Sequence, residues 1–336
     1  MVRLPTWKEW PDGRAAPSEL LALYSRGYQG AYRSEADNEE VADCLEFVSY
    51  RDVREEYKLD DFAGNIERHR GLYLPYLSVQ ELQPDAYDEA QETGDCVSFW
   101  ARNHSDSVRA GDILSRGDAE SWRTLGATEH IYGYRENYRP GMSCARAVGC
   151  LIAGGGMLLR AVYEFADLRY YNSELAIRWG RRKGLPDAVR EKSQQHQIED
   201  ATVVDDLESL RVAFRCGYSV GGCSGLGLSA RRDANGVSDA SGSWAHAMWC
   251  GGYDERQQTL EAYGEGLVLF VNSWGNWNRG ATMIPGTVSH IPLGSCWVRE
   301  SVVERRCLKG GGFYTLSGAD GWAPIMLPDL GATGEI

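Results

Sequence analysis

The sequence predicts an α+β protein, and three observations support this class. A helical pattern begins at Cys96, directly after a Gly94–Asp95 turn, and a second helical pattern covers Asp205–Phe214. Patterns typical of buried strands follow around His246 and over residues 266–270. The composition, with 43% hydrophobic and 25% charged residues, is that of an ordinary globular protein. A chain of 336 residues is long enough for one large or two smaller domains with a real core.

Charge and hydropathy exclude several classes of partner. A net charge of -13 without a basic stripe argues against nucleic acid, because phosphate binding needs concentrated Lys and Arg. No apolar run approaches the roughly 18 residues of a membrane span, and the N-terminus has no apolar signal-peptide core. We therefore expect no nucleic-acid partner, no membrane partner and no secretion by a signal peptide. Nine cysteines without regular spacing fit a reducing cytoplasm, or a particle assembled there, rather than a disulfide framework.

Residues 1–70 are predicted to form a separate N-terminal extension. Short helical patterns occur around 18–24 and 38–48, and a charged stretch follows at 51–70. One role for such an extension is an arm that docks on a partner or on the protein's own surface. Residues 71–95 are then predicted to be an extended segment that leads into the turn before the first long helix.

The turn before Cys96 has the residues that a helix start requires. Gly94 can adopt the backbone angles of a tight turn, and Asp95 is a good N-cap or first-turn residue. The helix is predicted to run from Cys96 to about Val108. A cysteine at a helix N-terminus has its thiolate favoured by the helix dipole and by an imidazolium partner, so its pKa is expected to fall below the free value of about 8.5. The negative charge of Asp95 acts in the opposite direction.

Two later segments carry further chemistry. His246 is predicted to lie in a buried strand, and the apolar strand 266–270 delivers Asn272, which is followed by Ser273, Trp274 and Gly275. A last strand is predicted near residues 295–301, after the strand that delivers Asn272. The Gly-rich residues 309–336 are predicted to be a tail along the surface or on a neighbouring molecule. The remaining histidines are predicted to be solvated: His69, His104, His130, His196 and His290.

The order of Cys96, His246 and the Asn272–Gly275 run resembles the papain-like cysteine peptidases. The resemblance covers about residues 86–305. It implies a two-lobed α+β domain over residues 71–308. In that domain a helical lobe of about 96–202 faces an antiparallel, β-barrel-like lobe of about 203–308. It also implies that the extension 1–70 could be an inhibitory prosegment, which stays open beside the docking arm.

The resemblance also implies a role for each site residue. Cys96 would be the nucleophile and His246 the base, with Asn272 orienting the imidazole and Trp274 shielding that hydrogen bond. The backbone N–H of Cys96 and the side chain of Gln91 would form the oxyanion hole, although Gln91 lies one residue closer to the cysteine than is usual in the family. Gly94 would support the turn. Metal and cofactor are not expected, because the pairs Cys144/Cys150 and Cys216/Cys223 lack the spacing of a zinc site.

Two hypotheses of function follow from these patterns. The first is a papain-like thiol hydrolase, a cysteine peptidase that acts on a peptide or protein substrate. The second is a structural or assembly protein, for example of a virus or phage virion, that retains the fold with weak or no activity. In the second hypothesis the extension and the tail would contact other subunits of a large assembly.

Overall fold

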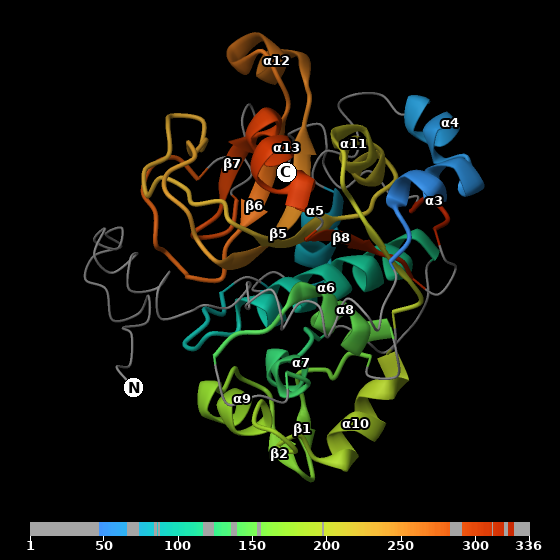
Figure 1. Ribbon diagram of the computed structural model, residues 1–336, viewed down its shortest axis with the longest axis vertical. Helices are drawn as coiled ribbons and strands as arrows, with labels where there is room; N and C mark the ends of the chain where they lie inside the picture. Colours follow the sequence, from blue (N-terminus) through green and yellow to red (C-terminus); the bar gives the residue numbers. More distant parts are fainter. Residues whose placement is uncertain are drawn as a thin grey trace.

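The structure is a computed structural model in which a helical layer packs against one antiparallel sheet (Figure 1). The described residues are 47–65, 74–83, 86, 88–116, 124–135, 140–152, 156–196, 198–282, 291–310, 312–318 and 322–325. Helix α6 (Cys96–Arg116) lies between the sheet and four shorter helices (Figure 1), which are α7 (Thr128–Gly133), α8 (Cys144–Ile152), α9 (Ser173–Trp179) and α10 (Asp187–Ser193). Helices and an antiparallel sheet thus occupy different parts of the molecule, and the predicted α+β class is confirmed.

Helix α6 (Cys96–Arg116) is the central element of the fold. All residues from 96 to 108 are buried, so this helix is enclosed on every side rather than amphipathic. On one side it packs against the strands β4 (Val220–Ser224), β5 (His246–Asp254) and β8 (Phe313–Leu316). It also packs against the helices α5 (Leu74–Leu82), α7 and α8. Gly221 on β4 permits the close approach, since a Cβ there would lie 2.7 Å from Nε1 of Trp100.

The side of the helical layer that faces away from the sheet has a small hydrophobic core of its own. It contains a two-stranded hairpin and three short helices, which are β1 (Val162–Tyr163), β2 (Ala166–Asp167), α9 (Ser173–Trp179), α10 (Asp187–Ser193) and the 3-10 helix η3 (Gln194–His196). The buried side chains of Leu158, Leu175, Trp179 and Val189 form its centre. Asn172 caps α9 by accepting a hydrogen bond from the backbone N–H of Leu175.

The sheet has six strands in the order β3-β8-β4-β5-β6-β7, with every neighbouring pair antiparallel. The strands are β3 (Ala201–Val203), β4 (Val220–Ser224), β5 (His246–Asp254), β6 (Leu267–Val271), β7 (Cys296–Arg299) and β8 (Phe313–Leu316). The helices beside it are α11 (Leu207–Arg215), α12 (Gln257–Tyr263), α13 (Glu300–Arg306) and η4 (Leu308–Gly310). The end strands β3 and β7 do not pair with each other within the described residues, so the sheet does not close into a barrel.

The C-terminal segment differs from its prediction. We expected residues 309–336 to be a surface tail, but Phe313–Leu316 form β8, a fully buried strand inside the sheet. This strand pairs with β3 on one side and with Gly221 and Gly222 of β4 on the other. This strand was not predicted because it has only four residues between glycines and because its partners lie about 90 to 115 positions away in the sequence.

The N-terminal segments also differ where they are described. Residues 71–95 were predicted to be extended, but they contain α5, in whose first turn Pro75 is tolerated because its missing N–H has no helical partner. Of the extension 1–70, the described part forms α3 (Tyr50–Tyr57) and α4 (Leu59–Gly64). Tyr50 and Leu59 are fully buried in the main core. The role of the extension as prosegment or docking arm stays a prediction, and residues 1–46 and 66–70 lie outside the described residues.

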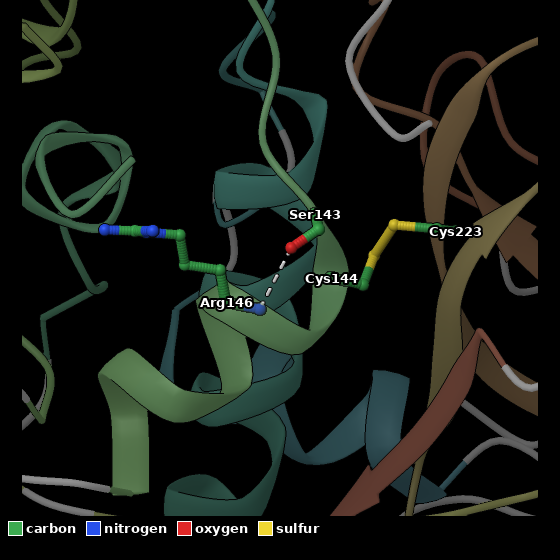
Figure 2. The surroundings of a disulfide bond; sticks show 4 residues. All are labelled: Ser143, Cys144, Arg146 and Cys223. Carbon is green, nitrogen blue, oxygen red and sulfur yellow. Dashed lines mark hydrogen bonds between the residues drawn. A yellow bond between two sulfur atoms is a disulfide. The ribbon is translucent and has the colours of Figure 1, made fainter. Parts of the chain in front are cut away.

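One cysteine pair is oxidised, contrary to the expectation of fully reduced cysteines. A disulfide joins Cys144, the first residue of α8, to Cys223 on β4, across 79 positions of sequence. Figure 2 shows the bridge between the start of the helix and the strand. The prediction was wrong because the spacing of cysteines along the chain does not show which of them the fold brings together. Among the described residues, six other cysteines are free and buried: Cys96, Cys150, Cys216, Cys250, Cys296 and Cys307.

Candidate functional site

His246 and Asn272 meet at one edge of the sheet. His246 is the first residue of β5, and Asn272 directly follows the neighbouring strand β6. The imidazole Nε2 lies 2.8 Å from Oδ1 of Asn272. Because a carbonyl oxygen only accepts, this contact places the proton of a neutral imidazole on Nε2 and leaves Nδ1 as the basic nitrogen. Nδ1 of His246 is buried and has no hydrogen-bond partner in the described part of the chain.

Tryptophan rings enclose the imidazole. The ring of Trp274 lies 4.4 Å from that of His246, centroid to centroid, with an angle of 31° between the planes. Trp244 packs 4.8 Å from Trp274, and Trp277 lies 5.2 Å from Trp244. These rings keep water from the bond between His246 and Asn272. Trp244 was not among the predicted site residues, although a residue two positions before His246 in an extended segment points to the same face.

Cys96 lies at the junction of the helical layer and the sheet. It is the first residue of α6, and the backbone N–H groups of Cys96 and Val97 face its sulfur and lower its pKa. The backbone of Ala247, the residue after His246, also hydrogen-bonds to the thiol. The structure therefore brings Cys96 next to the strand that carries His246, as the resemblance implies.

Burial controls the protonation of this pair. Burial raises the pKa of Cys96 to about 12, and the hydrogen bond from Ala247 offsets only part of that rise. Burial likewise lowers the pKa of His246 to about 4, while Asn272 acts in the opposite direction. The expected low pKa of Cys96 is therefore not found in this closed arrangement, because loss of water outweighs the helix N-terminus. Both groups are neutral at pH 7.

Asp95 precedes the cysteine and is fully buried. Its Oδ2 accepts a hydrogen bond of 2.7 Å from the hydroxyl of Tyr171, while Oδ1 is buried without a partner among the described residues. Burial raises the pKa of Asp95 to about 8, and the hydrogen bond from Tyr171 reduces that shift. The carboxyl group thus keeps its proton at neutral pH, so the negative charge expected beside Cys96 is absent there.

Gln91 and Gly94 lie in the segment that leads into Cys96. The backbone N–H of Gln91 donates to the carbonyl of Ser273 at 2.8 Å, and the Ser273 hydroxyl donates to Oε1 of Gln91. Nε2 of Gln91 donates one hydrogen to the carbonyl of Thr93 at 3.0 Å and retains a second. Gly94 does not have a positive φ. Its small size matters instead, because a Cβ would lie 3.2 Å from Cβ of Pro140.

The candidate site is closed to solvent. Cys96 is 0% exposed and His246 is 1% exposed. A surface pocket of about 680 Å³ lies elsewhere, and no residue of the candidate site lines it. Within the described residues, no three His, Cys, Asp or Glu side chains are grouped as a metal site. None of the described helices combines the length and the apolar character needed to cross a bilayer.

Two further histidines differ from their prediction. His104 and His130 were expected to be solvated, but both are fully buried. Nδ1 of His130 donates to the carbonyl of Ala127 at 2.7 Å, and its Nε2 accepts from the backbone N–H of Leu158 at 3.1 Å. Burial lowers the pKa of His130 to about 4. This histidine is therefore a neutral bridge between α7 and the segment after α8, and His69 and His290 lie outside the described residues.

Comparison with known proteins found structures that are similar in fold. Xylellain, a cysteine protease from Xylella fastidiosa, aligns with a TM-score of 0.46 and 15% identity over 70% of this chain and 84% of its own. The proform of the Amb a 11 cysteine protease, a ragweed pollen allergen, gives 0.45 and 13% over 89% and 76%. Digestive procathepsin L 3 of Tenebrio molitor larval midgut gives 0.41 and 14% over 90% and 100%. No family model and no curated protein match the chain.

Proposed function

We propose that the chain is a thiol hydrolase that cleaves peptide bonds, with Cys96 as nucleophile and His246 as base. The observation that carries this proposal is the orientation of His246. Its Nε2 is held by Asn272 at 2.8 Å, so the unpartnered Nδ1 is the nitrogen that can take the thiol proton. The backbone contact from Ala247 to the Cys96 sulfur supports the placement of the two groups at one junction.

The proposed reaction follows from these positions. The Cys96 thiol transfers its proton to Nδ1 of His246, and the sulfur attacks the carbonyl carbon of the substrate. The oxyanion accepts hydrogen bonds from the backbone N–H of Cys96 and from the second Nε2 hydrogen of Gln91. His246 then returns the proton to the leaving amine, and water hydrolyses the thioester to release the acid and restore the thiol. Asn272 keeps the imidazole in the tautomer that this sequence needs.

A peptide library assay tests the proposal. The full chain, in reducing buffer, is incubated with a mixed peptide library, and new termini are identified by mass spectrometry. Cleavage by the wild type, lost in Cys96→Ala and in His246→Ala, is the expected result. Cys150→Ala is the matched control, because Cys150 is also a buried free cysteine on a neighbouring helix. Cleavage that survives in Cys96→Ala would contradict the proposal.

The second candidate, a structural protein that retains the fold, is favoured by one observation. Cys96 is fully buried and its pKa lies far above neutrality, as in an inert core cysteine. In that case the wild type would cleave nothing under any redox condition. It would also elute in size-exclusion chromatography as an assembly rather than as a monomer of 37.3 kDa.

A further inference from the structure

The disulfide between Cys144 and Cys223 lies beside the candidate site. In the register of the sheet, Cys223 on β4 is opposite Ala247 on β5, and the next pair joins Ser224 to His246. Ala247 is also the residue whose backbone contacts the Cys96 sulfur. The bridge is therefore one strand away from the base and close to the nucleophile.

The same bridge crosses the boundary between the two layers of the fold. Cys144 belongs to α8, which packs on α6, and Cys223 belongs to the sheet. Figure 2 shows the start of α8 on one side of the bridge and the strand of Cys223 on the other. Cys96 is contributed by the helical layer and His246 by the sheet. A substrate that reaches both groups must enter between the layers that the disulfide ties together.

The site is closed while the bridge is present. Cys96 and His246 are 0% and 1% exposed, so no carbonyl group of a substrate can contact the sulfur in this arrangement. Burial also keeps both groups neutral, with the pKa of Cys96 raised to about 12 and that of His246 lowered to about 4. Entry of water between the layers would remove the cause of both shifts.

We propose that the Cys144–Cys223 disulfide is a redox-sensitive clasp that holds the site closed, and that its reduction by a small thiol opens the site to substrate. This inference rests on the proposed function, because only a hydrolase has a substrate that must reach Cys96. The two residues are only 3% and 5% exposed, which favours a small thiol over a folded redox enzyme as the reductant.

The chemistry requires two equivalents of a small thiol. The first thiolate attacks one sulfur of the bridge, which breaks the S–S bond, forms a mixed disulfide and releases one protein thiolate. The second thiolate attacks the mixed disulfide, which releases the other protein thiolate and the oxidised small molecule. Both protein thiolates take up protons, so Cys144 and Cys223 end as thiols and the two small thiols are oxidised to one disulfide.

Alkylation of Cys96 measures the opening directly. The oxidised wild type, the wild type after mild reduction and removal of the reductant, and the double variant Cys144→Ser/Cys223→Ser are each treated with iodoacetamide. The modified fraction of Cys96 is followed by peptide mass spectrometry, which also reports the state of the bridge. We expect Cys96 to react at least tenfold faster in the reduced protein and in the double variant than in the oxidised protein. Cys150→Ala controls for the loss of a thiol from α8 and should behave as the wild type.

An alkylation rate of Cys96 that does not depend on the bridge would overturn the proposal. If Cys96 reacts at one rate with the bridge intact, reduced or replaced, while the unfolding temperature falls on its loss, the bridge is only a structural cross-link and the proposal is wrong. If the double variant does not fold, the reduced and oxidised wild types alone decide the question. Faster alkylation without peptide cleavage would support the clasp and contradict the proposed hydrolase. Cleavage that is indifferent to reduction would contradict only the clasp.

Discussion

The imidazole of His246 is fixed by Asn272, whose Oδ1 lies 2.8 Å from Nε2 in a fully enclosed environment. The two residues are 26 positions apart but lie side by side because β5 and β6 are neighbouring antiparallel strands. Trp274, two residues after Asn272, covers the ring. This arrangement defines one tautomer and one orientation of the imidazole.

Replacement of Asn272 should therefore reduce turnover without removing the nucleophile. Asn272→Ala leaves the Nε2 proton of His246 buried and unpaired, at a cost of about 1–3 kcal/mol. We expect a fall in kcat of about tenfold to a hundredfold, with Cys96 still modified by a peptide-based alkylating probe. Peptide cleavage followed by mass spectrometry measures the effect.

Asn235→Ala is a suitable control for that variant. Asn235 is exposed and donates to the hydroxyl of Tyr263, away from the candidate site. Its replacement should leave cleavage unchanged. If Asn272→Ala cleaves peptides at the wild-type rate, the imidazole does not depend on this hydrogen bond and the role proposed for Asn272 is wrong.

Local sequence patterns predicted the segments that carry the candidate site. The run from Asn272 to Gly275 follows an apolar strand, and Cys96 follows a Gly-Asp turn, so both are visible in a few consecutive residues. The partners of Cys144 and of β8 are not visible in this way, because they depend on which distant segments the fold brings together. The closed state of Cys96 was also unpredictable, since burial is a property of the packed layers.

The buried acid Asp95 should make stability depend on pH. Its pKa is raised from the model-compound value of 3.8 to about 8, so the folded protein binds a proton that the unfolded chain has lost between these pH values. The stability from this group is fully present below about pH 4 and decreases as the pH rises to 8, by at most about 1.4 kcal/mol per unit. Asp95→Asn should therefore flatten the stability profile and stabilise the protein at pH 8.

Urea unfolding at several pH values between 4 and 8 checks this effect. Tyr171→Phe is the informative companion variant, because it removes the hydroxyl that donates to Asp95 and so raises the pKa of this carboxyl group further. In this variant the decrease should continue above pH 8 with the same limiting slope, which urea unfolding at pH 8 to 9 measures. Equal pH profiles for the wild type and Asp95→Asn would show that the carboxyl group titrates normally.

The buried strand β8 should make the C-terminal segment essential for stability. Phe313 is fully buried, and its ring lies 6.4 Å from that of Phe270 on β6. Truncation of such a side chain leaves a cavity, so Phe313→Ala should lower the free energy of unfolding by about 3–5 kcal/mol. Tyr170→Ala, at a position 78% exposed, should change it by less than about 0.5 kcal/mol. Similar urea midpoints for the two variants would argue against a place for β8 inside the sheet.

A buried ion network should anchor the segment that carries Gln91. Arg160 donates to Glu129 at 2.7 and 2.9 Å and to Glu89, two residues before Gln91, at 2.9 Å. Because Glu129 is fully buried, Arg160→Met leaves its charge uncompensated, and we expect a loss of about 3–5 kcal/mol in the free energy of unfolding.

Two comparisons separate this effect from a general loss of charge. Arg169→Met breaks an exposed pair with Asp167 and should cost less than about 1 kcal/mol. The double variant Arg160→Met/Glu129→Leu should recover most of the stability, because no unpaired buried charge remains. Urea unfolding gives the free energies, and peptide cleavage by the double variant tests whether Glu89 needs Arg160 to hold Gln91 near Cys96. A double variant no more stable than Arg160→Met would mean that the loss arises from packing rather than from the buried charge of Glu129.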